Sequence, residues 1–402
     1  MQTSFFTTAA QSFTSNEQLL QTLEQELESG NAVSTASANP AAFVGATGDT
    51  DDVGQLTAED SSQTNIQTTL GLGTTALSEA ATILDKIQQT ALEAINGTVN
   101  SSEFQSLSGQ VQQNLQQLIA VADTADNNGD FVFAGTAGNI KPFVQNSSGS
   151  TEYFGNDGIS TVEVSPGITV NAALSGTAFT GGFSGDGFAS VAAASGNTGT
   201  ATFLPVGILN DSSATQFQQG SKPITISFST NASGQATYTA TQGSATISSG
   251  PAKPGEDITL DGVQFELSGT PASGDNFTIA PARPQSVFAL IQGIQNALAT
   301  PGTTAAEHAQ TAQVLGNALA GITQYQNIIT SENARIGVIL QTVSNAQNDN
   351  AQAITTDQND AANLTSANVP QLLTEIDEQT TALQAALQAF GVTQGLDVFN
   401  FL

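Results

Sequence analysis

The sequence predicts an α+β fold in which helical segments from both ends of the chain form a long rod, and a β-rich domain is inserted between these segments. Apolar residues recur with a helical period over residues 1 to about 130 and again from about 285 to the end. Residues 131 to about 284 are instead rich in Gly, Ser, Thr and Phe and alternate with the period of two typical of strands. With 402 residues, 39% of them hydrophobic, the chain can form two or three domains.

The amino-terminal segment is expected to form an amphipathic helix that ends at Gly30–Asn31. Two further helices are predicted by apolar residues spaced alternately four and three apart, as in a heptad seam, and the break at Asn96–Gly97 favours an antiparallel hairpin. The first of these seams is Ile66, Leu70, Gly73, Leu77, Ala80, Leu84, Ile87, Ala91 and Ala94, and the second is Phe104, Leu107, Val111, Leu115, Leu118 and Ala122.

The middle region carries the strand signals. Apolar and polar residues alternate over Ile224–Phe228, and Phe277–Ile279 is expected to be a closing strand. Asp261–Gly262 lies between two alternating segments, and this dipeptide is a strong signal for a two-residue β-hairpin.

The helical pattern then returns. A short helix over residues 287–298 is expected to end at Pro301–Gly302, and a longer one should run from about Thr304 to Asp357. At 1.5 Å per residue the longer helix would reach about 80 Å, a length typical of rods and bundles rather than of compact enzymes. Its stripe is Leu315, Leu319, Ile322, Ile329, Ile336, Leu340 and Val343.

The apolar stripes at the two extreme ends are the candidate functional residues. Terminal segments have few neighbours to pack against, so each apolar face needs a partner. Pro370, in the first turn of the last helix, is tolerated there. The predicted assembly interface consists of Phe5, Phe13, Leu20, Leu23, Leu27, Val369, Leu372, Leu373, Ile376, Leu383, Leu387, Phe390, Leu396, Phe399 and Phe401.

Composition restricts the possible partners. Thirty-five acidic residues against six Lys and Arg give a formal charge of −29, which repels nucleic acid and anionic membrane surfaces. No segment approaches the roughly 18 consecutive apolar residues that would insert into a membrane. The first residues, Met1–Phe6, lack the basic region of a secretory signal, so any export is expected to proceed without a cleaved signal peptide.

No residue constellation predicts catalysis, and we expect neither an enzyme nor a cofactor or metal site. The absence of Cys excludes disulfides and thiolate ligands. His308, the only histidine, is expected on a helix surface. The acidic segment Asp123–Asp130 fails the EF-hand spacing, so it is interpreted as a turn that ends a helix and starts a strand at Phe131–Phe133.

Four sets of residues resemble the flagellin superfamily, and within it the hook-associated junction proteins. They are Leu27–Val33 with Ser37–Ala42, Asp130–Thr136 with Lys141–Phe143, Tyr153–Gly158 with Val170–Ala172, and Ala382–Leu387 with Leu396–Leu402. The first set departs from the usual pattern, because Ala38 replaces an acidic residue and the basic residue after the glycine is missing.

The resemblance implies three flagellin-like parts: residues 1–44 with 366–402 as a terminal assembly domain, 45–135 with 285–365 as a helical rod, and 136–284 as an outer β-rich domain. It implies a secreted, extracellular subunit of the bacterial flagellum, exported through the flagellar type III apparatus. Its partners would be other copies in a ring, another hook-associated protein on the hook side, flagellin on the filament side and an export chaperone. Terminal helices would fold on assembly, since isolated helices of this length are marginal in water.

Two alternatives stay open from the sequence. The chain could be flagellin, the bulk subunit of the filament, or an acidic secreted adhesin on a helical stalk. The carboxyl-terminal Phe399–Leu402 and the stretch Phe131–Thr136 favour the junction subunit over flagellin. The Gly/Ser/Thr-rich residues 185–250 are expected to tolerate shortening, because they contain no seam residue.

Overall fold

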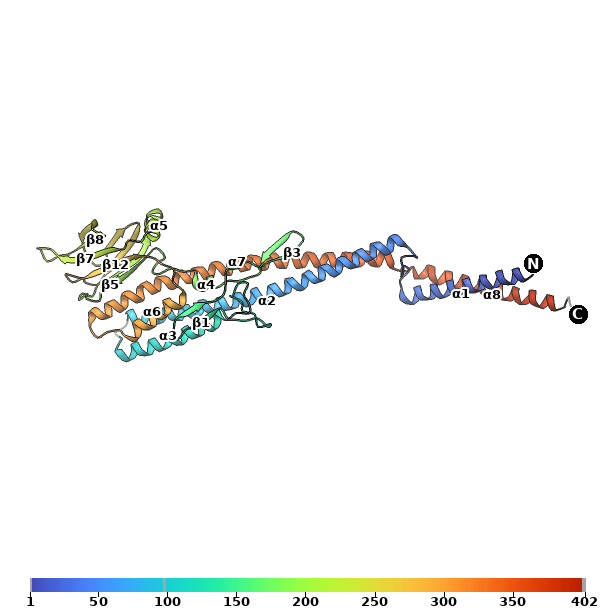
Figure 1. The fold of residues 1–402 in the computed structure, drawn as a ribbon, viewed down its shortest axis with the longest axis horizontal. Helices are drawn as coiled ribbons and strands as arrows, with labels where there is room; N and C mark the ends of the chain where they lie inside the picture. The colour runs from blue at the N-terminus through green and yellow to red at the C-terminus, as the bar shows by residue number, and fades with distance from the viewer. Residues whose placement is uncertain (1, 97–98, 400–402) are drawn as a thin grey trace. The chain divides into compact units, whose positions relative to one another are not determined.

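The computed structural model describes residues 2–96 and 99–399, with side chains described for residues 7–96 and 99–392. It divides the chain into two compact units: unit 1 is residues 1–63 with 344–402, and unit 2 is residues 64–343. The α+β class and the inserted β-rich region are as predicted (Figure 1). The finer three-part division at residues 44, 135, 284 and 365 stays a prediction.

Unit 1 is entirely helical apart from its connections. It contains α1 (Gln2–Ser29), α8 (Val369–Phe399), the beginning of α2 (Pro40–Asn96) and the end of α7 (Ala305–Thr365). Pro40 opens α2, where its missing N–H costs nothing, and the Asn39 side chain accepts the N–H of Ala42 at 3.2 Å. Glycine ends α1 as predicted, since Gly30 has a φ of +67°.

The remaining parts of α2 and α7 form the helical rod of unit 2, and the predicted heptad stripes are buried in it. Every apolar side chain of the α2 seam from Ile66 to Ala94 is at most 7% exposed. On α7, Leu315, Ile322, Ile329, Ile336 and Val343 are buried, whereas Leu319 and Leu340 are partly exposed. The α7 helix is 61 residues long and continues past the predicted end at Asp357, because no Gly or Pro lies between Asp357 and Thr365.

Two shorter helices complete the rod. The α3 helix (Ser101–Ala122) begins with a capping box, in which Asn100 accepts the N–H of Glu103 and the Glu103 carboxylate accepts the N–H of Asn100. The α6 helix (Val287–Ala299) packs against α3, and the Ser108 hydroxyl donates to the Gln295 carbonyl at 3.1 Å. The predicted break after Asn96 is present, but Gly97 lies outside the described residues.

The β-rich region begins with two small hairpins and continues as two packed sheets. The hairpins are β1 (Phe143–Gln145) with β2 (Thr151–Tyr153), and β3 (Thr161–Ser165) with β4 (Ile168–Asn171). The larger sheet has the order β5-β12-β7-β8-β9 and the smaller one β10-β11-β6, all antiparallel. Their strands are β5 (Ala189–Ala193), β6 (Thr202–Ile208), β7 (Ile224–Thr230), β8 (Ala236–Gln242), β9 (Ala245–Pro251), β10 (Asp257–Leu260), β11 (Val263–Ser268) and β12 (Asn276–Pro281); short helices α4 (Thr177–Thr180) and α5 (Asp211–Gln219) lie between strands.

One core holds the larger strands together. It takes apolar side chains from both sheets and from α5, among them Phe203, Phe265 and Phe277, whose rings lie 5.1 to 6.2 Å apart. The predicted hairpin is confirmed: Asp261 and Gly262 have φ of +47° and +83° between β10 and β11, the geometry of a primed turn.

One predicted strand is wrong. Phe131–Phe133 forms turns rather than a strand, with only an isolated bridge between Phe131 and Ala125. The alternation of a strand would turn every second side chain to solvent, but Val132, Phe133 and Ala134 are all at most 4% exposed. Burial of three consecutive side chains is therefore the reason that this segment folds as turns and does not pair as a strand. The preceding turn is as predicted, because the Asp126 carboxylate accepts the N–H groups of Asn128 and Asp130.

Candidate assembly interface

The two ends of the chain form an antiparallel helical hairpin in unit 1. The α1 helix packs along α8 (Figure 1). The rings of Phe13 and Phe390 meet edge to face at 5.6 Å. At the base of the hairpin, Asn31 and Ser366 form an antiparallel bridge. Backbone hydrogen bonds from Ala32 N–H to the Thr365 carbonyl and from Ala367 N–H to the Gly30 carbonyl brace it on both sides.

The less exposed positions of each helix follow a heptad. They are spaced alternately four and three apart, as in a coiled-coil seam. On α1 they are Ala9, Phe13, Asn16, Leu20, Leu23 and Leu27; on α8 they are Leu372, Ile376, Gln379, Leu383, Ala386 and Phe390. Eight of the predicted interface residues are therefore used inside the chain, where they join its own two ends.

Other predicted interface residues remain exposed. Leu373 and Leu387 are 48% and 53% exposed, and each directly follows a seam position of α8. Val369, at the start of α8, is 42% exposed. Sequence reasoning missed Leu19 and Val392, which are 47% and 64% exposed, although their places beside the heptad positions could have shown them. We call these five exposed residues the flanking row; by helical spacing, Val369, Leu373 and Leu387 share one side of α8.

The remaining predicted residues cannot be placed as contacts. Phe401 lies outside the described residues, and so do the side chains of Phe5, Leu396 and Phe399, although the latter three belong to helices.

A second cluster, in unit 2, unites residues that are far apart in the sequence. Gly135 N–H donates to the Leu174 carbonyl, Thr136 N–H donates to the Asn156 side chain at 3.0 Å, and Tyr153 lies with its ring 5.1 Å from that of Phe143. The Tyr153 hydroxyl also accepts the Gly176 N–H at 2.9 Å, and burial raises its pKa.

Gly135 is required in this cluster by its geometry. Its φ is +68°, and a Cβ there would lie 1.9 Å from the Asn156 carbonyl oxygen. The segments around Gly135 and Asn156 are two of those that carry the sequence resemblance, so the structure gives that resemblance a packing reason.

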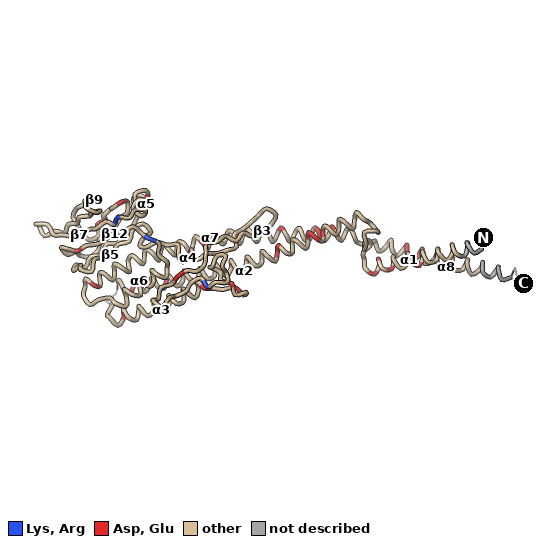
Figure 2. The backbone as a smooth tube through the Cα atoms, viewed as in Figure 1, with Lys and Arg blue, Asp and Glu red and all other residues tan. Residues whose placement is uncertain are grey.

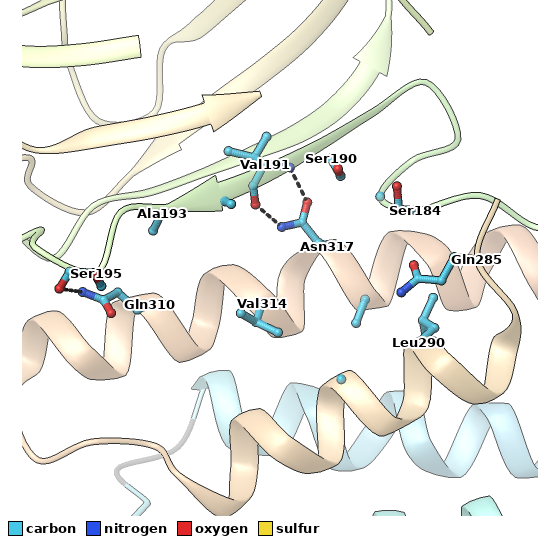
Figure 3. Close-up of a pocket in the computed structure, with 14 residues that line it drawn as sticks. Ser184, Ser190, Val191, Ala193, Ser195, Gln285, Leu290, Gln310, Val314 and Asn317 are labelled. Carbon is cyan, nitrogen blue, oxygen red and sulfur yellow. Dashed lines mark hydrogen bonds between the residues drawn. The ribbon is translucent and has the colours of Figure 1, made fainter. Parts of the chain in front are cut away.

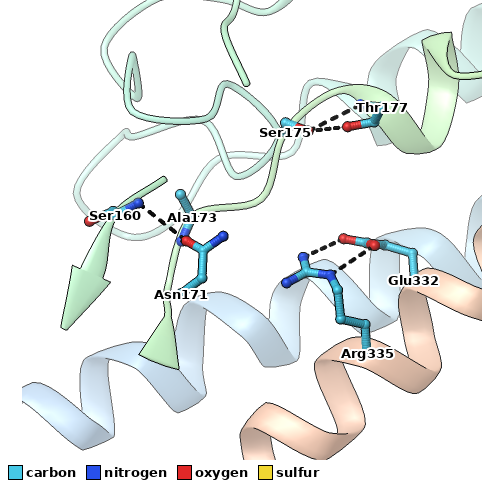
Figure 4. A network of polar contacts seen from close by, with 7 residues as sticks. All are labelled: Ser160, Asn171, Ala173, Ser175, Thr177, Glu332 and Arg335. Carbon is cyan, nitrogen blue, oxygen red and sulfur yellow. Dashed lines mark hydrogen bonds and ion pairs between the residues drawn. The ribbon is translucent and has the colours of Figure 1, made fainter. Parts of the chain in front are cut away.

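Polar contacts fix the end of the small hairpin β3–β4 close to this cluster (Figure 4). The Asn171 side chain accepts the N–H groups of Ser160 and Ala173. On α7, the Arg335 guanidinium donates to both carboxylate oxygens of Glu332, and this contact raises the arginine pKa.

A cavity of about 370 Å³ lies between α7, α6 and the edge strand β5 (Figure 3). Amide side chains of α7 cover this edge. Asn317 accepts the Val191 N–H and donates to the Val191 carbonyl, as a neighbouring strand would, and Gln310 donates to the Ser195 carbonyl. Gln313, 1% exposed, accepts the Phe203 N–H of β6 and donates to the Phe203 carbonyl. The cavity is therefore a space beside a sheet-to-helix joint and carries no reactive group.

The two segments that lead from the helices into the larger sheets and back are both held by α7. The hydroxyl of fully buried Tyr325 accepts the Gly182 N–H at 3.1 Å and donates to the Gln285 carbonyl. Between these points, Ser184 N–H donates to the Arg283 carbonyl at 2.9 Å, so the outgoing and returning segments are paired. We call this paired, clamped segment the neck.

The residues considered for chemistry take structural positions. His308 lies exposed on α7 with its ring 5.6 Å from that of Phe104, which agrees with the predicted helix surface. Asp123 accepts the Phe143 N–H and pairs with Lys141 at 3.3 Å, and burial raises its pKa. Among the side chains that are described, no group of three or more acidic, His or Cys residues is placed to hold a metal ion. None of the described helices is long and apolar enough to cross a membrane.

Comparison with known proteins shows similarity to proteins of the bacterial flagellum. The bacterial flagellin N-terminal helical region matches residues 4–138, which include α1, α2 and α3. The structure of FlgL from Xanthomonas campestris is similar at 26% identity, with 76% of this chain and 97% of that chain covered and a TM-score of 0.67. The amino-terminal third of the chain therefore matches the flagellin family model, and the chain as a whole is similar in fold to a flagellar FlgL protein.

Further flagellin-like structures share the fold. Hook-associated protein-3 from Legionella pneumophila covers 79% of this chain and 98% of its own, at 23% identity and a TM-score of 0.72. The flagellar junction protein FlgL from the same organism covers 74% and 98%, at 23% identity and a TM-score of 0.67. No curated protein matches the sequence significantly. Among flagellin-like proteins, the FlgL type fits this chain better than bulk flagellin does.

Proposed function

We propose that the chain joins the hook to the filament and assembles through its terminal hairpin. The observation that supports this most strongly is the similarity to Xanthomonas campestris FlgL. The similarity extends over 97% of that protein, and the two sequences are 26% identical. The name FlgL is also given to a flagellar junction protein in Legionella pneumophila. A structural role agrees with the contacts, which are packing, capping and clamping interactions.

The proposed partners are other copies of the chain in a ring, another hook-associated protein on the hook side and flagellin on the filament side. An export chaperone would hold the terminal helices before assembly, and export through the flagellar type III apparatus would leave the chain unprocessed. The flanking row supports self-assembly, because it places exposed leucines on two helices whose most extensive contact in unit 1 is with each other.

Localisation tests the proposal. Antibody against the β-rich region, visualised with gold on isolated flagella, is expected to mark one narrow zone between hook and filament. A strain lacking the protein should keep its hooks and lose attached filaments. Gold along the whole filament would instead show that the chain is flagellin.

Complementation tests the interface. Leu373→Ser combined with Leu387→Ser should restore no filaments in the deletion strain, although the protein is produced and exported. Ile159→Ser combined with Leu209→Ser is the matched control, because these side chains in unit 2 are still more exposed, at 71% and 70%. Equal motility of the two variants would place the interface elsewhere.

A further inference from the structure

The edge strand β5 has one backbone position that the rest of the protein leaves uncovered. Val191 turns its N–H and carbonyl away from β12, and the Asn317 side chain of α7 binds both groups. Because backbone groups alternate in direction along an antiparallel strand, Ala193 turns its N–H and carbonyl to the same side. The next position of this kind, Ser195, has its carbonyl bound by Gln310. Among the contacts of the described residues, no hydrogen bond reaches the Ala193 N–H or carbonyl on this side.

The α7 helix explains this gap. Gln310, Val314 and Asn317 succeed one another on the face of α7 that lies toward β5 (Figure 3). The two amides bind the strand edge, but the Val314 side chain between them can neither donate nor accept a hydrogen bond. Val314 is also 44% exposed, so no other side chain packs fully over it. The helix therefore covers the edge on both sides of Ala193 and leaves Ala193 itself open.

The cavity of about 370 Å³ lies at this opening (Figure 3). Ala193 and Val314 both line it, and Leu290 and Gly293 of α6 form its apolar side. A Cβ built on Gly293 would meet no atom within 4 Å, so no neighbouring side chain fills the space there. The Gln285 side chain lines the same space, and its amide makes no hydrogen bond among the described residues. The cavity thus combines apolar walls with unpaired neutral hydrogen-bonding groups.

Charge selects the kind of molecule that fits. The whole chain has a formal charge of −29, but none of the 14 residues that line the cavity is charged. The strand β5, the helix α6 and the facing part of α7, residues 310–318, contain no Asp, Glu, Lys or Arg (Figure 2). An ionised group would lose its hydration here without gaining a counter-ion. The occupant should therefore be uncharged and should present one donor and one acceptor to Ala193.

The two covering amides limit the length of that occupant. They bind Val191 and Ser195, which are four residues apart, a distance of about 13 Å along the strand. One amino-acid residue can exchange both hydrogen bonds with Ala193 in this interval, as in a hydrogen-bonded pair of an antiparallel ladder. A longer strand would have to displace Asn317 or Gln310 from the edge. The site accordingly fits a small molecule better than an added strand from another protein.

We propose that the cavity is a binding site for a small, uncharged N-acylated amino-acid amide. The ligand's N–H donates to the Ala193 carbonyl, its carbonyl accepts the Ala193 N–H, and its small apolar side chain lies against Val314. This site is separate from the terminal hairpin and independent of the proposed role at the hook–filament junction. With two hydrogen bonds and little buried area, the dissociation constant should be on the order of 1–10 mM.

Titration of the full-length chain with N-acetylalanine methylamide, followed by ligand-observed NMR, tests the site. The wild type should bind with a dissociation constant in the range above. Val314→Gln places a third amide opposite Ala193 and should weaken binding at least about tenfold. The matched control is Val338→Gln, because Val338 lies on the same helix outside the cavity, is 68% exposed and should leave the affinity unchanged. A second ligand tests the hydrogen bonds without any variant: the fully N-methylated analogue has no N–H donor and should bind the wild type about three- to tenfold more weakly.

Four results would overturn the proposal. The wild type could show no binding at about 20 mM ligand, the N-methylated analogue could bind equally well, or both valine variants could lose affinity alike. In the fourth, N-acetyltrialanine methylamide would bind more than about tenfold tighter than the single-residue ligand, which would show that the whole edge accepts a strand. The comparison of the two single-residue ligands uses the wild type alone, so it decides the matter even where Val314→Gln does not fold.

Discussion

Replacing Tyr325 by Phe should loosen the neck without leaving a cavity. The ring stays, but the buried hydroxyl that accepts the Gly182 N–H and donates to the Gln285 carbonyl is lost. Each buried backbone group left without a partner costs about 1–3 kcal/mol. With partial relaxation we expect a total of about 2–4 kcal/mol, or roughly a 30-fold to 1,000-fold increase in the opening equilibrium of this segment.

Hydrogen exchange measures this opening directly. A single free energy of unfolding is not well defined for a chain with two units, so exchange should be followed in peptides covering residues 180–191 and 281–290. Tyr238→Phe is the matched control, because the half-buried Tyr238 hydroxyl has one contact, at 3.0 Å to the Ser248 hydroxyl, and its loss should cost under about 1 kcal/mol. If Tyr325→Phe accelerates exchange at the neck no more than Tyr238→Phe does around β8, the clamp does not hold the neck.

Three further outcomes are expected. Removing residues 186–282 and joining Gly185 to Arg283 through a short glycine linker should leave the helices folded, measured by far-ultraviolet circular dichroism, since Ser184 and Arg283 are already paired; a large loss of helix would contradict this. Asp186→Asn should weaken the pH dependence of stability. Burial raises the Asp186 pKa above 3.8 in the folded state, so this carboxyl group stabilises the fold below pH 3.8, and the stabilisation is lost as pH rises through the raised pKa. The Asn variant lacks this titration, so its melting temperature should not fall over the same pH range. Glu307→Gln should lower the melting temperature at pH 7, and the difference from the wild type should shrink as pH falls through the Glu307 pKa, which hydrogen bonds from the Thr303 and Thr304 N–H groups lower below 4.5.

The helical part was accessible from sequence because its periodicity is long and regular. The α2 and α3 seams repeat for several heptads. The glycine after Ser29 and the prolines at the starts of α2 and α8 mark helix ends, which depend on the conformational preferences of single residues. The hairpin at Asp261–Gly262 was equally accessible, because two consecutive residues with positive φ restrict the residue types allowed. Such features depend on neighbours within a few residues.

Features that depend on distant partners were not accessible. Phe131–Phe133 has strand composition, but its side chains pack in a cluster completed by residues about 20 and 40 positions later. The buried amides Gln313 and Asn317 look like polar surface positions of a helix until β5 and β6 are placed against them. The predicted tolerance of residues 185–250 to shortening stays a prediction, but removal of the whole segment would take out β5 to β8 and most of β9 and leave β12 without both of its neighbours.

The terminal stripes show how periodicity can identify an interface and still leave its partner open. A heptad states only that a face must be covered, and the antiparallel return of α8 covers most of it within one chain. What remains exposed is the flanking row, in which Val369, Leu373 and Leu387 share one side of α8. We therefore expect substitutions on this side of α8 to affect assembly while leaving the hairpin itself intact, because the seam that joins α1 to α8 is built from other residues.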